Sequence, residues 1–317
     1  MKNRIPVLSF IAILIFSITL SSCVKPKTSK ADDSQNSKDA NSIANAVDAN
    51  SDDAAAMAGQ VAGFAGKTTS SGWYMLCGQT VVDTGNGHTI KITYDGTTNC
   101  NGVKRTGTVV VTLNNGSPDW SVAGATATML INNVVVTDAG TGNSFTLNGT
   151  QTITNETGGL AWQLWWNAAP GTVVKHREQS TNMSVKFSDG TTGTWSVDRT
   201  RTWSLSSTTP AYRTFSVSSE HAGNTDTWGT NRYNESFTTS ITQTISANDY
   251  STNCWWRPYT GKYVYSVPAR NATASITFGT NSVFQQIGTA TTCAPGYTLN
   301  YTLSTYNYAI NIYLPYW

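Results

Sequence analysis

The feature that most constrains the fold is a two-residue alternation of apolar and polar side chains, which recurs from residue 73 to residue 317. Apolar residues alternate with threonine, serine, lysine or asparagine in segments such as 90–94, 109–113, 183–187 and 306–314. This period is typical of half-buried antiparallel strands, because successive side chains of a strand point to opposite faces of the sheet. Threonine on the polar face favours strands through its β-branched side chain.

Dipeptides that favour tight turns separate these segments. An Asn or Asp followed by Gly supplies the positive φ angles that a two-residue hairpin turn requires. The pairs are Asn86-Gly87, Asp95-Gly96, Asn101-Gly102, Asn115-Gly116, Asn148-Gly149 and Asp189-Gly190. We therefore predict a single all-β domain over residues 73–317, with about 12–14 mostly antiparallel strands arranged as a β-sandwich or as a curved open meander.

The composition argues against several classes of protein. Only 12% of the residues are Asp, Glu, Lys or Arg, and the formal net charge is +2. A helical bundle needs more charged helix-forming residues, and a nucleic-acid-binding protein needs a basic excess. The chain also lacks a P-loop, a G-x-S-x-G elbow and an H-E-x-x-H motif. We therefore expect no nucleic-acid partner, no cofactor and no metal.

Residues 1–22 have the organisation of a secretory signal peptide. Lys2 and Arg4 precede an uncharged apolar run over 7–20, which is shorter than the roughly 20 residues of a membrane-spanning helix. The run ends at Leu20-Ser21-Ser22-Cys23, which resembles the lipobox of bacterial lipoproteins. This resemblance implies that Cys23 is acylated and that its acyl chains hold the protein on a membrane. A transmembrane anchor is the alternative.

Residues 23–72 are rich in Ala, Ser, Asp and Asn and contain few aromatic residues. We expect this stretch, which begins with the lipidated Cys23, to be a flexible tether. Ile43, Val47 and Met57 lie among alanines and also allow a weak helix. We interpret that helix as a nascent one within a spacer, and a helix that docks on a partner is the alternative.

Four further cysteines, Cys77, Cys100, Cys254 and Cys293, fit an exported protein. Four cysteines allow three pairings, and an oxidising compartment favours disulfides. The simplest assignment pairs Cys77 with Cys100 and Cys254 with Cys293, so that each bond closes a local loop. A tetrathiolate zinc site is the alternative, although the chain has no C-x-x-C pair.

Two segments carry a family resemblance. Residues 92–113 (ITYDGTTNCNGVKRTGTVVVTL) and 185–203 (VKFSDGTTGTWSVDRTRTW) resemble uncharacterised outer-membrane lipoproteins of Bacteroidota. The shared pattern is a Cys-containing turn, an Arg-x-Gly and a Val/Thr strand, followed later by Phe-x-Asp-Gly-Thr and Arg-x-Arg-x-Trp. The resemblance extends loosely from Cys77 to Tyr301. It implies an exported all-β domain at the outer membrane, on either its periplasmic or its cell-surface side. That family has no assigned activity, so no site residue is transferred.

Two pairs of polar residues could carry chemistry. His176 and Glu178 share a strand face by alternation, as a metal site or an acid–base pair would require, but surface polar positions are the simpler interpretation. Arg199 and Arg201 form a similar pair, which we interpret as cross-strand partners of acidic or tyrosyl side chains rather than as a stripe for an anionic ligand. Neither pair identifies a catalytic residue. We therefore expect a non-enzymatic protein, with a hydrolase as the less favoured alternative.

The tryptophans give the strongest functional indication. Trp162, Trp165 and Trp166 lie in a segment bounded by glycine and proline, and the side chains of the adjacent Trp255 and Trp256 cannot both face one core. Exposed tryptophans contact sugars, membranes or proteins, whereas the simpler alternative is that these rings cap the core. We therefore predict a lipid-anchored binding or adhesion module for a glycan or an apolar ligand, with these five residues as candidate contacts. A structural or envelope-assembly protein with a protein partner is the alternative.

Overall fold

The computed structural model describes residues 33–59, 77–83, 88–100, 102–114, 116, 119–165, 168–207, 211–249, 257–289, 291, 294–303 and 308–315. These residues form one α-helix, a sheet of fourteen strands and three short 3-10 helices. The helix is α1 (Asp33–Ala58), and the 3-10 helices are η1 (Ala161–Trp165), η2 (Ala222–Asn224) and η3 (Pro268–Arg270). The strands are β1 (Gln79–Asp83), β2 (Thr89–Asp95), β3 (Val103–Leu113), β4 (Ala125–Asp138), β5 (Ser144–Asn155), β6 (Val173–Phe187), β7 (Thr192–Leu205), β8 (Arg213–Ser219), β9 (Thr225–Thr230), β10 (Ser236–Asn248), β11 (Pro258–Val267), β12 (Ala272–Thr280), β13 (Gly296–Leu303) and β14 (Tyr308–Pro315).

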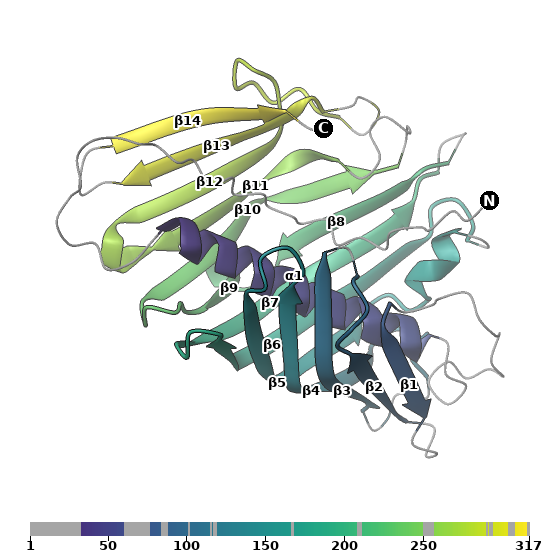
Figure 1. Ribbon diagram of the computed structural model, residues 1–317. Helices are drawn as coiled ribbons and strands as arrows, with labels where there is room; N and C mark the ends of the chain where they lie inside the picture. Colours follow the sequence, from purple (N-terminus) through teal and green to yellow (C-terminus); the bar gives the residue numbers. More distant parts are fainter. Residues whose placement is uncertain are drawn as a thin grey trace.

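Nearly every strand pairs antiparallel with its neighbours in the chain, so the sheet is a meander. The exception is that β8 and β9 both lie between β7 and β10, each pairing with a different half of those two strands. The predicted all-β fold is confirmed. Of the two predicted architectures, the chain adopts the curved open meander, because all its strands belong to one sheet (Figure 1).

Bulges allow the long strands to bend. The register between β3 and β4 shifts at Gly107, which has φ +102° and where a Cβ would meet the carbonyl oxygen of Asn133 at 2.2 Å. The prediction that Asn148-Gly149 forms a hairpin turn is wrong, because both residues lie inside β5 where its register with β6 shifts. The positive φ that suits Gly to a tight turn suits it equally to a bulge.

The helix α1 lies across the inner, concave face of the sheet (Figure 1). Its buried side chains include Ile43, Val47, Ala54 and Met57, which belong to the same apolar core as residues of β2 to β7. The prediction of a flexible tether over 23–72 is therefore wrong for Asp33–Ala58, and the folded domain begins before residue 73. The face of α1 that meets the sheet recurs every three or four residues, at Ile43, Val47, Asn50, Ala54 and Met57. Because this face includes Asn50, it is too polar to be recognised in the sequence as an apolar helix face.

The apolar core has two parts along the inner face. The first joins α1 to the strands β2 to β7, with contributions from β10 and β11. The second lies farther along the sheet and includes Trp203, Phe215, Ile245, Ile276 and Leu299. The predicted alternation over 90–94, 109–113 and 183–187 is confirmed, because every apolar residue predicted there to face the core is buried.

The connections between strands gather at two ends of the sheet, which we name after the 3-10 helices that they contain. The η3 end holds the turns at 188–191, 231–235 and 268–271, and the first turns of α1 lie there because Asp39 accepts a hydrogen bond from Arg232. The η1 end holds the described parts of the connections at 156–172, 249–257 and 281–295. Where side-chain exposure is described, five of the six exposed large apolar residues belong to the η1 end: Val122, Val173, Val283, Phe284 and Ile287.

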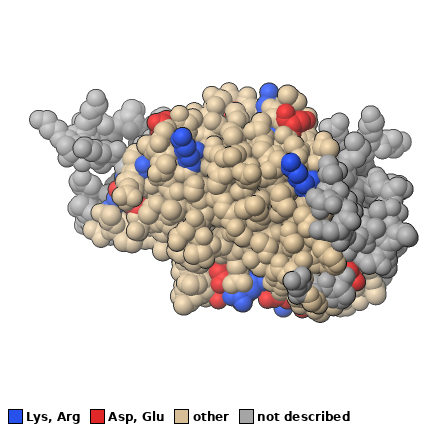
Figure 2. Space-filling view, turned by 90° about the horizontal axis from the view of Figure 1, so that it is seen from below, with Lys and Arg blue, Asp and Glu red and all other residues tan. Residues whose placement is uncertain are grey.

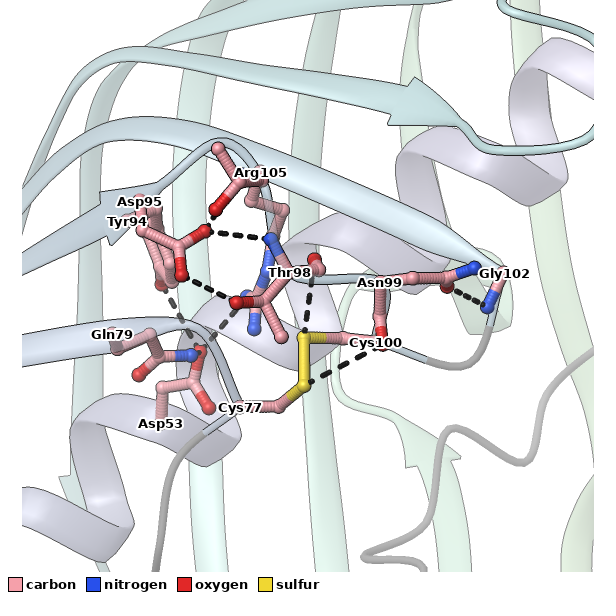
Figure 3. The surroundings of a disulfide bond; sticks show 11 residues. Asp53, Cys77, Gln79, Tyr94, Asp95, Thr98, Asn99, Cys100, Gly102 and Arg105 are labelled. Carbon is pink, nitrogen blue, oxygen red and sulfur yellow. Dashed lines mark hydrogen bonds and ion pairs between the residues drawn. A yellow bond between two sulfur atoms is a disulfide. The ribbon is translucent and has the colours of Figure 1, made fainter.

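A disulfide joins Cys77, just before β1, to Cys100 in the turn between β2 and β3 (Figure 3). This bond confirms one of the two predicted pairs. Cys254, Cys293 and the predicted lipidation site Cys23 lie outside the described residues. Within the part of the chain that the structure describes, no helix is both long and apolar enough to cross a membrane.

Charged side chains are few on the surface that Figure 2 shows. The middle of that face is almost uncharged, and its Lys, Arg, Asp and Glu side chains lie mainly towards the margins. The low overall charge is accompanied by charges that are buried inside the fold, since Glu178, Arg199 and Arg201 are each 1–2% exposed. These buried charges lie at the interface between α1 and the sheet.

Candidate binding site

Polar residues of the inner face lie beneath α1. His176 and Glu178 of β6 share this face, as the alternation predicts, and they are 2% and 1% exposed. Their interpretation as surface positions is wrong, because α1 brings charged groups to the arginines that bind Glu178, and two tryptophan rings flank His176.

Glu178 is a shared acceptor for two arginines of β7. Arg199 Nε donates to one carboxylate oxygen at 3.1 Å, and Arg201 Nη1 donates to the other at 2.9 Å. Glu178 lies directly opposite Arg199 in the register of β6 and β7. The interpretation of the two arginines as partners of an acidic side chain across the strand is therefore confirmed.

The helix supplies further carboxylates to the same arginines. Asp48 pairs with Arg199, and Asp52 Oδ1 lies 2.8 Å from Arg201 Nη2. Burial raises the pKa of Asp52 to about 7, because desolvation of the carboxylate outweighs its attraction to Arg201. The carboxyl of Asp52 therefore titrates near neutral pH on the side of the helix that faces Arg201.

A second contact between α1 and the sheet lies next to the disulfide (Figure 3). Asp53 lies 2.8 Å from Arg105 Nη1 and accepts hydrogen bonds from Tyr94 Oη at 3.1 Å and from Gln79 Nε2 at 2.7 Å. Desolvation raises the pKa of Asp53 against the effect of Arg105. Three strands, β1, β2 and β3, thus converge on one carboxylate of the helix.

We call this set of charges the buried network. Its members are Arg105, Arg199 and Arg201 with Asp48, Asp52, Asp53, Glu178 and Asp226. Desolvation also raises the pKa of Asp226 to about 6. Buried ion pairs contribute little net stability compared with apolar packing, but they restrict which groups can meet. The arrangement therefore holds α1 at one position on the sheet and leaves its carboxylates shielded from solvent.

His176 does not join the buried network as a ligand or a base. Its ring lies between the indoles of Trp120 and Trp203, at centroid distances of 5.2 and 4.9 Å, in edge-to-face geometry. Burial lowers the pKa of His176 to about 3, so the imidazole is neutral at physiological pH. Among the described residues, no group of three or more metal-ligating side chains comes together.

The opposite, outer face of the sheet carries a polar cluster in which Gln179 and His221 are exposed, whereas the central Asp198 is 7% exposed. Arg177 lies between His176 and Glu178 in sequence and therefore points outward. Its guanidinium donates through Nε and Nη2 to both oxygens of Asp198, at 2.9 and 3.0 Å, and this bidentate pairing raises the pKa of Arg177. Gln179 Nε2 also donates to Asp198, at 3.4 Å.

An aromatic pair borders the carboxylate of Asp198. The ring of His221 stacks on the indole of Trp228, with a centroid distance of 4.5 Å and an interplanar angle of 24°. His221 Nδ1 lies 4.0 Å from Asp198 Oδ2, and the His221 side chain is 46% exposed. Asp198 thus receives Arg177 and Gln179 on one side and faces the His221–Trp228 stack on the other. We call Arg177, Gln179, Asp198, His221 and Trp228 the outer cluster.

The outer cluster is assembled by the local irregularity of the sheet. Strands β8 and β9 are interrupted by η2, where Gly223 has φ +71°, and His221 immediately precedes this short helix. The break lets β8 continue into β9 between the same two strands, so His221 lies near Trp228 of β9. Gly223 and Asn224 are residue types that favour a break in a strand, but nothing in the sequence pairs Trp228 with Asp198.

The predicted tryptophan contacts lie at the η1 end or outside the described residues. The backbones of Trp162 and Trp165 lie in η1, but their side chains fall outside the described part of the structure, as do Trp166, Trp255 and Trp256. The described flanks of both tryptophan segments lie at the η1 end. Their role as contacts stays a prediction, and sequence reasoning missed Trp228.

No family model, no curated protein and no solved structure matches this chain.

Proposed function

We propose that this chain is an outer-membrane-anchored lipoprotein whose β-sheet domain is a non-enzymatic binding module for a glycan. The observation that carries the proposal is the outer cluster, in which the bidentate Arg177–Asp198 pair lies beside the His221–Trp228 stack. The cluster lies on an open sheet face and combines fixed polar groups with an aromatic surface.

A glycan suits the chemistry of the outer cluster. Neighbouring sugar hydroxyls act as donors and acceptors at once, which suits the carboxylate of Asp198 and the amide of Gln179. The C–H face of a sugar ring packs on aromatic surface such as that of His221 and Trp228. The Arg177–Asp198 pair orients both groups before a ligand arrives, which lowers the entropic cost of binding.

Binding rather than hydrolysis fits the positions of the acidic groups. Asp52 and Asp226 have carboxyls whose pKa values are raised to about 7 and about 6, as general acid–base catalysis would favour. Both lie in the buried network and are paired with arginines beneath α1. The Asp226 side chain is buried, and the carboxylate of Asp52 is directed to Arg201 in the interface between helix and sheet.

The anchoring part of the proposal gains a tighter geometry from α1. If Cys23 carries the acyl chains, only the ten residues from Cys23 to Asp32 separate the anchor from the folded domain. Ten extended residues span at most about 33–36 Å, so the domain stays close to the membrane surface. The module then binds ligands near the membrane rather than at the end of a long tether.

A glycan array followed by calorimetric titration of the best ligand tests the proposal. The variants are Trp228→Ala and Asp198→Asn, with Lys186→Ala as a matched control on the outer face of the same sheet. We expect both cluster variants to weaken binding by at least tenfold, and the control to leave the affinity unchanged. Absence of binding to every glycan, or binding that both cluster variants retain, would overturn the proposal.

The alternative of a structural or envelope-assembly protein is favoured by a different observation. Strand β14 carries no charged residue, and among the described strands none pairs with its outer edge. An edge of this kind favours pairing with another protein strand.

A further inference from the structure

Among the described strands, β1 and β14 form the two edges of the meander, and they differ in how they are protected. β1 has five residues, ends in the charged Asp83, and begins two residues after the disulfide-bonded Cys77. Its Gln79 is also bound to the helix through Asp53. Short length, charge and anchoring are the features by which natural sheets prevent pairing at an edge.

β14 has none of these protections along most of its length. Its eight residues, YAINIYLP, carry no charge, and the only proline is the last residue, Pro315. Its register with β13 runs from Tyr308 to Pro315 without a bulge. Within the described residues no strand pairs with its other side, so that side presents backbone N–H and C=O groups to a further strand.

The second part of the apolar core continues to this edge. Two rows of cross-strand neighbours run from buried residues of β12, through β13, to β14: one from Ile276 through Leu299 to Ile312, and one from Phe278 through Tyr297 to Leu314. Ile276 and Leu299 are 3% and 6% exposed, whereas the β14 residues are half-buried. The apolar side chains of the core are thus partly exposed at β14, where one more strand would cover them.

We infer that β14 is a dimerisation strand, which pairs antiparallel with β14 of a second copy of this chain about a two-fold axis perpendicular to the sheet. Such an axis keeps the inner face of one copy continuous with the inner face of the other. Residues directly opposite each other in an antiparallel pair point to the same face, so a residue must meet itself at the centre. With Ile312 at the centre, Ile310 of each copy faces Leu314 of the other.

A second copy of this chain pairs with the free backbone groups of β14 more completely than a strand of a different protein would. Pairing of β14 with itself is isologous, so one contact uses both unprotected edges and closes the assembly. The two remaining edges are then the protected β1 strands, which prevents growth into a fibre. No charge in β14 opposes the approach of an identical strand.

The test is the association state of the purified full chain in mild detergent. Sedimentation over a range of concentrations should give twice the mass of one chain, after subtraction of bound detergent. Ile312→Lys places like charges directly opposite each other and should restore the single-chain mass. Thr80→Lys is the matched control, because it adds the same charge at an exposed position of the other edge strand, and it should leave the dimer intact.

A covalent readout covers the case in which Ile312→Lys does not fold. Under oxidising conditions Ile312→Cys should give a disulfide-linked dimer across the two-fold axis, and Thr80→Cys should not. A single-chain mass at every concentration without cross-linking of Ile312→Cys would overturn the inference, as would a dimer that survives in folded Ile312→Lys. Cross-linking of Thr80→Cys to the same extent would also overturn it.

Discussion

Asp52 of α1 lies 2.8 Å from Arg201 of β7, and Asp48, one helical turn earlier, pairs with Arg199. The two aspartates are four residues apart on a helix, which corresponds to about 6 Å along its axis. The two arginines are two residues apart on a strand, which corresponds to about 6.6 Å. The two spacings match, so each aspartate meets its own arginine, and a shift of the helix by one turn would leave one of the two arginines opposite an alanine.

Removal of Arg201 should be strongly destabilising. Arg201→Met keeps much of the side-chain volume but leaves Asp52 and Glu178 buried without their shared cation. Loss of one partner of a buried pair costs about 3–5 kcal/mol in the free energy of unfolding. Urea denaturation followed by circular dichroism measures this loss.

Lys186→Ala on the outer face provides the reference, since substitutions at exposed positions change stability by less than about 0.5 kcal/mol. A loss below about 1 kcal/mol in Arg201→Met would mean that the buried network does not hold α1 in place.

The pKa of Asp52 predicts an unusual dependence of stability on pH. Its pKa is about 7 in the folded protein and about 3.9 in an unfolded chain. Between these values the folded state holds a proton that the unfolded state has released, so this carboxyl makes the protein less stable as pH rises from 4 to 7. Above pH 7 its contribution is constant.

Comparison with Asp52→Asn isolates this contribution from those of other groups. The amide mimics the protonated carboxyl at every pH, so the stability of the variant relative to the natural chain should increase by roughly 2–4 kcal/mol between pH 4 and pH 8. Urea denaturation at several pH values measures the difference. A difference that does not change with pH would contradict the raised pKa.

His176 predicts a pH effect of opposite sign. Its pKa is about 3 in the folded protein and about 6.5 in an unfolded chain. Above pH 6.5 its contribution to stability is fully present, and it is lost as pH falls towards 3, because the unfolded state then binds a proton that the buried ring refuses. His176→Phe preserves a ring between Trp120 and Trp203 and removes this titration.

We therefore expect acid to unfold His176→Phe at a lower pH than the natural chain. Tryptophan fluorescence during acid titration measures the midpoint. His221→Phe, which replaces an exposed histidine, is the control and should leave that midpoint unchanged. Equal midpoints for all three proteins would show that His176 is not held neutral by burial.

The sheet could be predicted from the sequence because alternation is a local signal. Ile90, Ile92 and Tyr94 alternate with polar residues, and all three are buried as expected. The helix could not be predicted in the same way, because charged contacts as well as apolar surface bind it to the sheet. Asp52 and Asp53 resemble solvated spacer residues until Arg201 and Arg105 are placed opposite them, and those contacts join residues far apart in the chain.

The outer cluster was beyond sequence reasoning for a related reason. Asp198 and Trp228 are brought together only when β9 enters the sheet beside β7. No periodic pattern records which strands become neighbours when one strand position is divided between β8 and β9. The burial of His176 and Glu178 could not be predicted either, since alternation indicates that they share a face but does not show what covers that face.

The bulge at Gly107 supplies the last prediction. Gly107 has φ +102°, and a Cβ there would lie 2.2 Å from the carbonyl oxygen of Asn133 on the neighbouring strand. Gly107→Ala must therefore accept both an unfavourable φ and a backbone clash.

Gly102 is the matched control, because its φ is +85° and a Cβ there meets nothing within 4 Å. Gly102→Ala should cost about 1 kcal/mol through φ alone. The clash should make Gly107→Ala costlier by at least about 2 kcal/mol, because the β3–β4 pairing must open to admit the methyl group. Thermal unfolding of the two variants measures the difference, and equal stabilities would show that the bulge does not require close backbone approach.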